Sequence, residues 1–247
     1  MHVFAEEYSV AFNDPVAIDL IGYDKEDDRQ LLFVFECKRA YTVQKTWIFF
    51  KDFDPFFRLC RVVAPSFGQF GKYLPTTPMW KPPSPICSEG YEVVASGKSL
   101  KADQRPIFEA ANQLCKGFLG FVQTRMNQKA DSRIHGDKIM DCIFPVLVTT
   151  AELRLAEFDL SKVSIQTGNL DAGLNLQPLD WLVLKHPFSI AADSSCKDFR
   201  NNPHHIEDQN QWRQSHRECI YVVNSTALPK FLNQYGFRRY MHNLKIN

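Results

Sequence analysis

Three segments near the N-terminus are rich in apolar and β-branched residues, and this pattern predicts three successive β-strands. They run from Val3 to Phe12, from Val16 to Tyr23 and from Leu31 to Lys38. An Asn-Asp-Pro turn at 13–15 separates the first two strands, and a charged connection at 24–30 separates the second from the third. Because both connections are short and polar, we expect the strands to form an antiparallel meander.

A long amphipathic helix is predicted from Asp103 to Gln128, because apolar residues recur there every three or four positions. Asp103 is a suitable N-cap, and Pro106 suits the first turn. We expect the apolar stripe of this helix to pack on the sheet formed by the first three strands. The stripe comprises Ile107, Ala111, Leu114, Phe118 and Phe121.

The segments on either side of this helix give weaker signals. Residues 42–53 fit either a short helix or a strand, and the closely spaced prolines from Pro75 to Pro85 predict a loop. After the helix, the apolar run at 141–153 is typical of a strand that is covered on both faces. Further short strands are predicted at 153–159, 162–168, 180–188 and 218–224, with a polar loop at 194–217 and a last helix at 225–236 that Ser225 would cap.

The composition is that of a globular protein, with 45% hydrophobic and 23% charged residues. No segment approaches the roughly 20 apolar residues that a membrane helix needs, and the first residues lack the features of a signal peptide. The seven cysteines form no Cys-x-x-Cys pair, so we expect mostly buried free thiols in a reducing, cytoplasmic location.

The net charge of +1 provides no global attraction for nucleic acid, so a nucleic-acid site would require a local basic patch. The densest candidate patch contains Arg238, Arg239 and Lys245 near the C-terminus, and Arg39 directly follows the third strand. A solvated tail accounts equally well for the three C-terminal residues.

The third strand, "LLFVFECK", ends in charged residues although it begins as one of the most apolar segments of the chain. Burying a charge is costly unless the charge is paired or binds a metal. Because side chains alternate along a strand, Glu36 and Lys38 share one face, whereas Cys37 points to the other face and is expected to be buried. Asp19 is a single acid within the apolar second strand.

Whether Asp19 meets Glu36 depends on the register of the hairpin. If the turn centres between residues 26 and 27, Asp19 lies opposite Val34 and is the diagonal neighbour of Glu36. A shift by one residue would place the two acids on opposite faces. Two converging carboxylates suit Mg²⁺, and a neighbouring lysine can orient or activate a water. The alternative is a strand that simply reaches the surface and forms an acid–lysine ion pair.

An acid on one strand followed by Glu-x-Lys on the next resembles the PD-(D/E)xK nuclease superfamily, which has the restriction-endonuclease-like fold. The residues that match are Asp19, Glu36 and Lys38. The resemblance implies an α/β (α+β) protein in which a mixed central sheet is flanked by helices. Family members often carry a polar residue on the helix after the Glu-x-Lys strand, and Gln113 is the position that we match, with Gln44 as the second choice.

The chain departs from the family pattern at two places. Ile18 stands where the family has a proline before the first acid. The first helix of the family, which often supplies a metal-binding Glu, has no counterpart here, and Glu7 or Glu6 of the first strand would take its place.

The resemblance also suggests how the chain is divided. It implies a nuclease-like core at 1–150 with a proline-rich insertion near 53–100. A β-rich segment with a polar loop would be inserted at 151–218, and the strand and helix at 219–247 would pack on the core.

The function that the resemblance implies is an endonuclease dependent on Mg²⁺ or Mn²⁺ that hydrolyses phosphodiester bonds, with DNA as the expected substrate. Asp19 and Glu36, with Glu7, would bind the metal, and Lys38 would position or activate water beside Gln113. Arg39 and the C-terminal basic residues would contact nucleic acid. A membrane is not an expected partner, whereas a homodimer or a defence-system partner protein fits the family. The alternative is a degenerate member of the same fold that binds nucleic acid or protein without cleavage.

Overall fold

The computed structural model describes residues 2–10, 16–26, 29–39, 45–52, 61–63, 73–74, 84–96, 99–131, 139–158, 174–186 and 218–235. The predicted strand at 162–168, the predicted polar loop at 194–217 and nearly all of the proline-rich stretch lie outside these residues. Among the described helices, none is long and apolar enough to cross a membrane.

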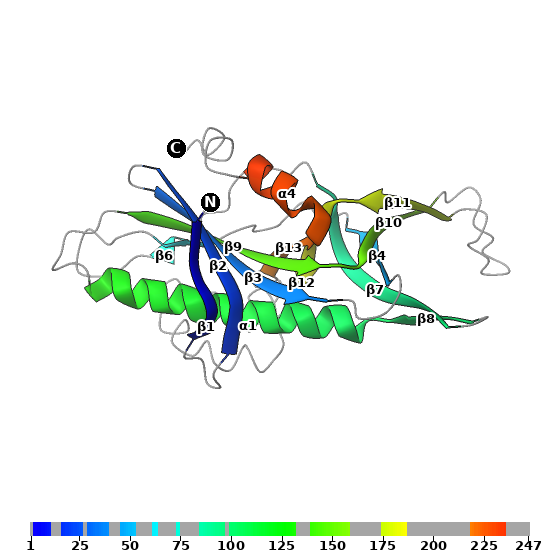
Figure 1. The fold of residues 1–247 in the computed structure, drawn as a ribbon, viewed down its shortest axis with the longest axis horizontal. Helices are drawn as coiled ribbons and strands as arrows, with labels where there is room; N and C mark the ends of the chain where they lie inside the picture. Colours follow the sequence, from blue (N-terminus) through cyan, green and yellow to red (C-terminus); the bar gives the residue numbers. More distant parts are fainter. Residues whose placement is uncertain are drawn as a thin grey trace, which may run out of the picture.

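All thirteen described strands join one large sheet, with a long helix on one face (Figure 1). The helices are α1 (Arg105–Asp131), the short 3₁₀ helix η4 (Ser225–Ala227) and α4 (Leu228–Tyr235). The strands are β1 (His2–Val10), β2 (Val16–Glu26), β3 (Arg29–Lys38), β4 (Thr46–Lys51), β5 (Arg61–Val63), β6 (Tyr73–Leu74), β7 (Ile86–Ser96), β8 (Ser99–Asp103), β9 (Met140–Thr149), β10 (Glu152–Phe158), β11 (Leu174–Leu179), β12 (Trp181–His186) and β13 (Glu218–Asn224).

The sheet is mixed, which confirms the predicted α/β class. Its order is β1-β2-β3-β9-β13-β12-β7-β4-β10-β11. The first three strands pair antiparallel, so the predicted meander is confirmed, and β9 then lies parallel to β3. A parallel neighbour requires a crossover connection, and α1 lies within that connection. The strands within 151–218 and 219–247 pair in the same sheet as those of 1–150.

Each face of the sheet has its own core. Alternation along β3 sends Leu32 and Val34 into the core beneath α1, whereas Phe33 and Phe35 enter the opposite core, where Phe231 of α4 packs. Figure 1 shows α1 and α4 on opposite sides of the strands.

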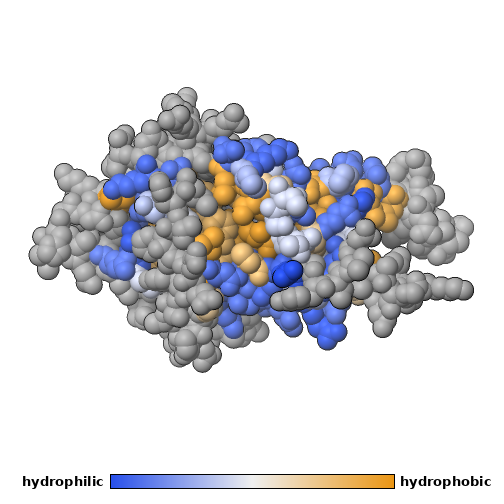
Figure 2. Space-filling view, in the orientation of Figure 1, coloured by the Kyte–Doolittle hydropathy of each residue, from blue (hydrophilic) through white to orange (hydrophobic). Residues whose placement is uncertain are grey.

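The predicted apolar stripe of α1 lies in the first core, together with residues of β2 and β3, as expected. Figure 2 shows hydrophilic residues along the edge where α1 lies and hydrophobic residues over the neighbouring strands. At the start of the helix, Oδ1 of Asp103 accepts a hydrogen bond of 2.9 Å from the backbone N–H of Arg105, so Asp103 binds one of the free N–H groups of the first turn.

The predicted register between β2 and β3 is wrong by two residues. Val34 pairs with Ile21, not with Asp19, and the next pair is Phe35 with Leu20. The charged connection is shorter than expected because β2 continues to Glu26 and β3 begins at Arg29, which moves the centre of the turn by one residue. The shift is even, so the faces of the strands are those predicted.

The structure agrees with one of the two alternatives for segment 42–53, and two further details differ from the sequence predictions. The ambiguous segment 42–53 contains a strand, β4, and β7 lies in the middle of the sheet although no strand was predicted there. At the end of β13, Asn224 rather than Ser225 caps the 3₁₀ turn, because its side chain accepts a hydrogen bond from the backbone N–H of Thr226.

Glycine at position 90 is required by the packing of β7 on β4. Gly90 pairs with Phe49, whose side chain is fully buried. A Cβ atom at position 90 would lie 2.5 Å from Cε1 of Phe49 and 3.2 Å from Cδ1 of Ile107 in α1. The absence of a side chain therefore lets the Phe49 ring lie against the strand beneath α1.

Candidate active site

Four of the predicted site residues come together where β2, β3 and α1 meet. Continuing the register from the pair of Leu20 and Phe35 by one residue places Asp19 opposite Glu36. Nζ of Lys38 lies 2.6 Å from Oε1 of Glu36 and donates a hydrogen bond of 3.0 Å to Oε1 of Gln113. The expected convergence of acid, Glu-x-Lys and helix glutamine is thus present in the geometry.

The backbone of β3 also holds Asp19. The backbone N–H of Cys37 donates a hydrogen bond of 2.6 Å to Oδ2 of Asp19. This bond fixes the Asp19 carboxylate against the end of β3 and uses one of its oxygens.

The local sequence explains why these side chains gather here. The apolar part of β3 is buried on both faces, so the strand is held rigidly between β2 and β9. Glu36 and Lys38 continue the face of Leu32 and Val34, which packs beneath α1. Gln113 lies on the exposed flank of α1, and it therefore meets Lys38 at the border of the core.

Glu36 is a buried carboxylate, with only 2% of its surface exposed. Burial raises the pKa of Glu36, the hydrogen bond from Lys38 lowers it, and the negative charge of Asp19 raises it again; the net shift is upward. The side chain of Lys38 is 37% exposed, so this ion pair joins a buried carboxylate to a side chain that is partly in contact with solvent. A cation beside Glu36 thus offsets part of the cost of burying its charge.

Cys37 differs from its expected state, because it is exposed rather than buried. Phe33 and Phe35 fill the opposite core, but the end of β3 extends beyond it. Partial burial of the thiol is the largest cause that raises the pKa of Cys37, and the negative charges of Asp19 and Glu36 raise it further. The thiol is therefore protonated and a poor nucleophile at neutral pH.

The donor set fits a hard divalent cation. Mg²⁺ commonly takes one or two carboxylates and completes its shell with waters and substrate phosphate oxygens. Asp19 and Glu36 provide the two carboxylates on neighbouring strands. Within the described residues there is no group of three or more His, Cys, Asp or Glu side chains that could hold a metal.

Glu7, the third predicted ligand, is described only as part of the backbone of β1. Glu6 pairs with Leu20 and Tyr8 pairs with Ile18, so position 7 lies opposite Asp19 in the register. The position of Glu7 on the strand is thus compatible with the prediction that it is a metal ligand.

The predicted nucleic-acid contacts are largely outside the described chain. Arg39 is exposed directly after β3. Arg238, Arg239, Lys245 and Gln44 lie outside the described residues.

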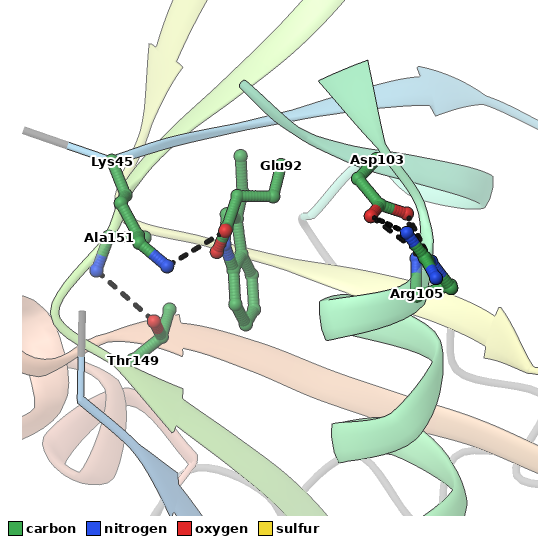
Figure 3. A network of polar contacts seen from close by, with 7 residues as sticks. Lys45, Glu92, Asp103, Arg105, Thr149 and Ala151 are labelled. Carbon is green, nitrogen blue, oxygen red and sulfur yellow. Dashed lines mark hydrogen bonds and ion pairs between the residues drawn. The ribbon is translucent and has the colours of Figure 1, made fainter. Parts of the chain in front are cut away.

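A cluster of buried polar side chains near the starts of β4 and β10 was not predicted from the sequence. Glu92 of β7 is 7% exposed and accepts hydrogen bonds from Nζ of Lys45 at 2.8 Å and from Nε1 of Trp47 at 3.0 Å. Figure 3 shows Lys45 and Glu92 pointing toward each other, near Thr149 and Ala151. The signal was hidden because β7 itself was not predicted, so the alternation that turns Glu92 inward could not be read.

The turn between β9 and β10 links this group to the end of β3. Lys38 pairs with Thr149 across the parallel strands, and the carbonyl oxygen of Lys38 accepts a hydrogen bond of 3.3 Å from the backbone N–H of Thr150. Two residues later, the backbone N–H of Glu152 donates a hydrogen bond of 3.0 Å to the carbonyl oxygen of Lys45. One short turn therefore fixes both Lys38 and Lys45.

Comparison with known proteins gives no further assignment for these residues. Neither a protein-family model, nor a curated protein, nor a solved structure matches the chain.

Proposed function

We propose that this protein is a metal-dependent nuclease with the restriction-endonuclease-like fold, and that it hydrolyses phosphodiester bonds in DNA. The observation that carries the proposal is the contact of Lys38 with both Glu36 and Gln113, beside Asp19 on the neighbouring strand. An incidental surface ion pair would not be expected to place its acid in the core and its lysine against a helix glutamine.

The order of the elements also supports the proposal. An antiparallel meander, β1 to β3, precedes α1, which covers one face of the sheet, and β9, which lies parallel to β3. The strands β4 to β8 lie between β3 and α1 in the chain. With these strands taken as an insertion, the order is the βββαβ that the resemblance implies after its first helix. The remaining strands extend the sheet beyond β9.

In the proposed site, Asp19 and Glu36 would hold the cation through their carboxylate oxygens, with Glu7 as the proposed third ligand. When bound, Mg²⁺ or Mn²⁺ would neutralise charge on the phosphate and increase the acidity of a water. The hydrogen bond from Cys37 keeps Asp19 in place. Lys38, at the exposed border of the site, orients the attacking water and donates a hydrogen bond to the phosphate, and Gln113 orients the ammonium group.

The test is a cleavage assay on plasmid, single-stranded DNA and RNA with Mg²⁺ or Mn²⁺. We expect cleavage of DNA that is lost in Asp19→Asn, Glu36→Gln and Lys38→Ala. Matched controls come from the exposed pair in which Nζ of Lys230 contacts Oδ2 of Asp180, because Asp180→Asn and Lys230→Ala remove the same chemical groups elsewhere. A wild type that binds DNA without cleaving it under any of these conditions would favour the non-cleaving binding module instead.

A further inference from the structure

We propose that the ammonium group of Lys38 and a divalent cation are alternative occupants of one cation position beside Glu36, so that metal binds only when Lys38 moves away. This inference rests on the proposed function, because it assumes that Glu36 is a metal ligand. It adds that the lysine of the site is also its internal competitor.

The geometry that supports the inference is the access to Glu36. The side chain of Glu36 is 3% exposed, and Nζ of Lys38 lies 2.6 Å from its Oε1. The ammonium group thus occupies the position beside Oε1 of Glu36, and the Lys38 side chain is itself 37% exposed. A cation that binds Oε1 of Glu36 has to displace the ammonium group.

The oxygen atoms of the second acid are also partly used. Oδ2 of Asp19 accepts the hydrogen bond from the backbone of Cys37. A cation shared by Asp19 and Glu36 would therefore lie close to Lys38. The cation and the ammonium group would repel each other at close range, and the repulsion is strong where burial limits screening by solvent.

Lys38 has a second partner that remains when it leaves Glu36. Its hydrogen bond to Oε1 of Gln113, 3.0 Å long, keeps the ammonium group at the border of the site. Displacement by metal would thus turn Lys38 from a partner of Glu36 into a group that is directed by Gln113 toward solvent and substrate. The same event would fill the metal position and free the lysine.

The test measures Mn²⁺ affinity by calorimetry and by electron paramagnetic resonance, without nucleic acid. Lys38→Met removes the competing charge and keeps much of the side-chain volume, and Lys38→Gln keeps a hydrogen-bond donor if the methionine variant does not fold. We expect either variant to bind Mn²⁺ at least about fivefold more tightly than the wild type, at the lower end of typical coupling between two sites.

The matched control is Lys45→Met, because Lys45 is paired at 2.8 Å with Glu92, another buried acid outside the site. Its Mn²⁺ affinity should equal that of the wild type. Adding Asp19→Asn to Lys38→Met should abolish the gain, which would assign the gain to this site.

The outcomes separate the inference from the proposed function. If the wild type binds Mn²⁺ and Lys38→Met binds it no more tightly, competition is refuted while the metal site stands. An equal gain in Lys38→Met and Lys45→Met would indicate a general effect of net charge and would also refute competition. If neither the wild type nor the Lys38 variants bind Mn²⁺, both the proposed function and the inference fail.

Discussion

At the scale of single residues, a buried histidine lies on β12 and has no role in the proposed site. His186 is 3% exposed, and its Nε2 lies 2.9 Å from Oδ1 of Asn112 in α1. The ring of Phe108 packs edge-on against it, with centroids 4.8 Å apart. Burial lowers the pKa of His186 from 6.5 to about 4, so the ring is neutral at physiological pH and serves as a packed core residue.

Because the ring of His186 is buried in its neutral form, we expect the folded protein to lose stability at acidic pH. Below pH 6.5 the unfolded chain protonates His186, whereas the folded chain keeps it neutral down to about pH 4. The contribution of the neutral His186 to the free energy of unfolding is therefore fully present above pH 6.5 and is lost as the pH falls toward about 4. The loss is about 2 kcal/mol near pH 5.

Urea unfolding at neutral and mildly acidic pH measures this effect, with His186→Gln as the comparison. The variant retains a polar partner for Asn112 but has no titrating ring, so its stability should fall less over the same pH range. Parallel pH profiles for the wild type and the variant would contradict the assignment.

Gln113 belongs to the same scale, as a positioning residue that acts through Lys38. Its replacement by alanine should leave Mn²⁺ affinity within about twofold of the wild type but lower the rate of the proposed cleavage by roughly 10- to 100-fold, because misplacement by about an ångström has effects of that size. A kinetic comparison of kcat with KM checks this, since the loss should appear in kcat. Gln177→Ala removes a glutamine that contacts Glu157 on β10 and is the control.

At the scale of elements, the contact of β7 with β4 makes a prediction about stability. Gly90→Ala would place a methyl group 2.5 Å from Cε1 of Phe49 and should destabilise the fold by about 1–3 kcal/mol, the usual cost of overpacking. Chemical denaturation measures the loss. Adding Phe49→Leu to Gly90→Ala should recover part of the lost stability. An unchanged unfolding midpoint in Gly90→Ala would show that β7 and β4 accommodate the methyl group without loss of stability.

Elements near the site could be predicted because their patterns are local. The apolar run of β3 and the stripe of α1 each specify one element, and the lone acid of β2 shows which strand faces Glu36. The exact register could not be read, because charged residues such as Glu26 and Arg29 fit both a turn and the end of a solvent-facing hairpin. β7 was missed because prolines precede it and Gly90 interrupts its pattern, and only its partner β4 explains that glycine.

At the scale of the whole molecule, a bound cation should stabilise the fold by mass action. At a Mg²⁺ or Mn²⁺ concentration about 100 times the dissociation constant, the gain in unfolding free energy is about 2.7 kcal/mol. Thermal melts with and without metal should show a rise in Tm for the wild type and none for Asp19→Asn or Glu36→Gln. Asp180→Asn should respond as the wild type does, and a wild type indifferent to both metals would contradict the proposed metal site.

The two contacts of the site join residues that are separated by very different lengths of chain, and this difference affects the order in which the site assembles. The contact between Cys37 and Asp19 spans 18 positions, whereas that between Lys38 and Gln113 spans 75. Closing the shorter loop loses less chain entropy, so we expect the hairpin to form first and the helix to dock later. During synthesis, both acids leave the ribosome well before Gln113. The newly made chain would thus carry its two carboxylates before it can complete the site, and the proposed cleavage would begin only after α1 has folded onto the sheet.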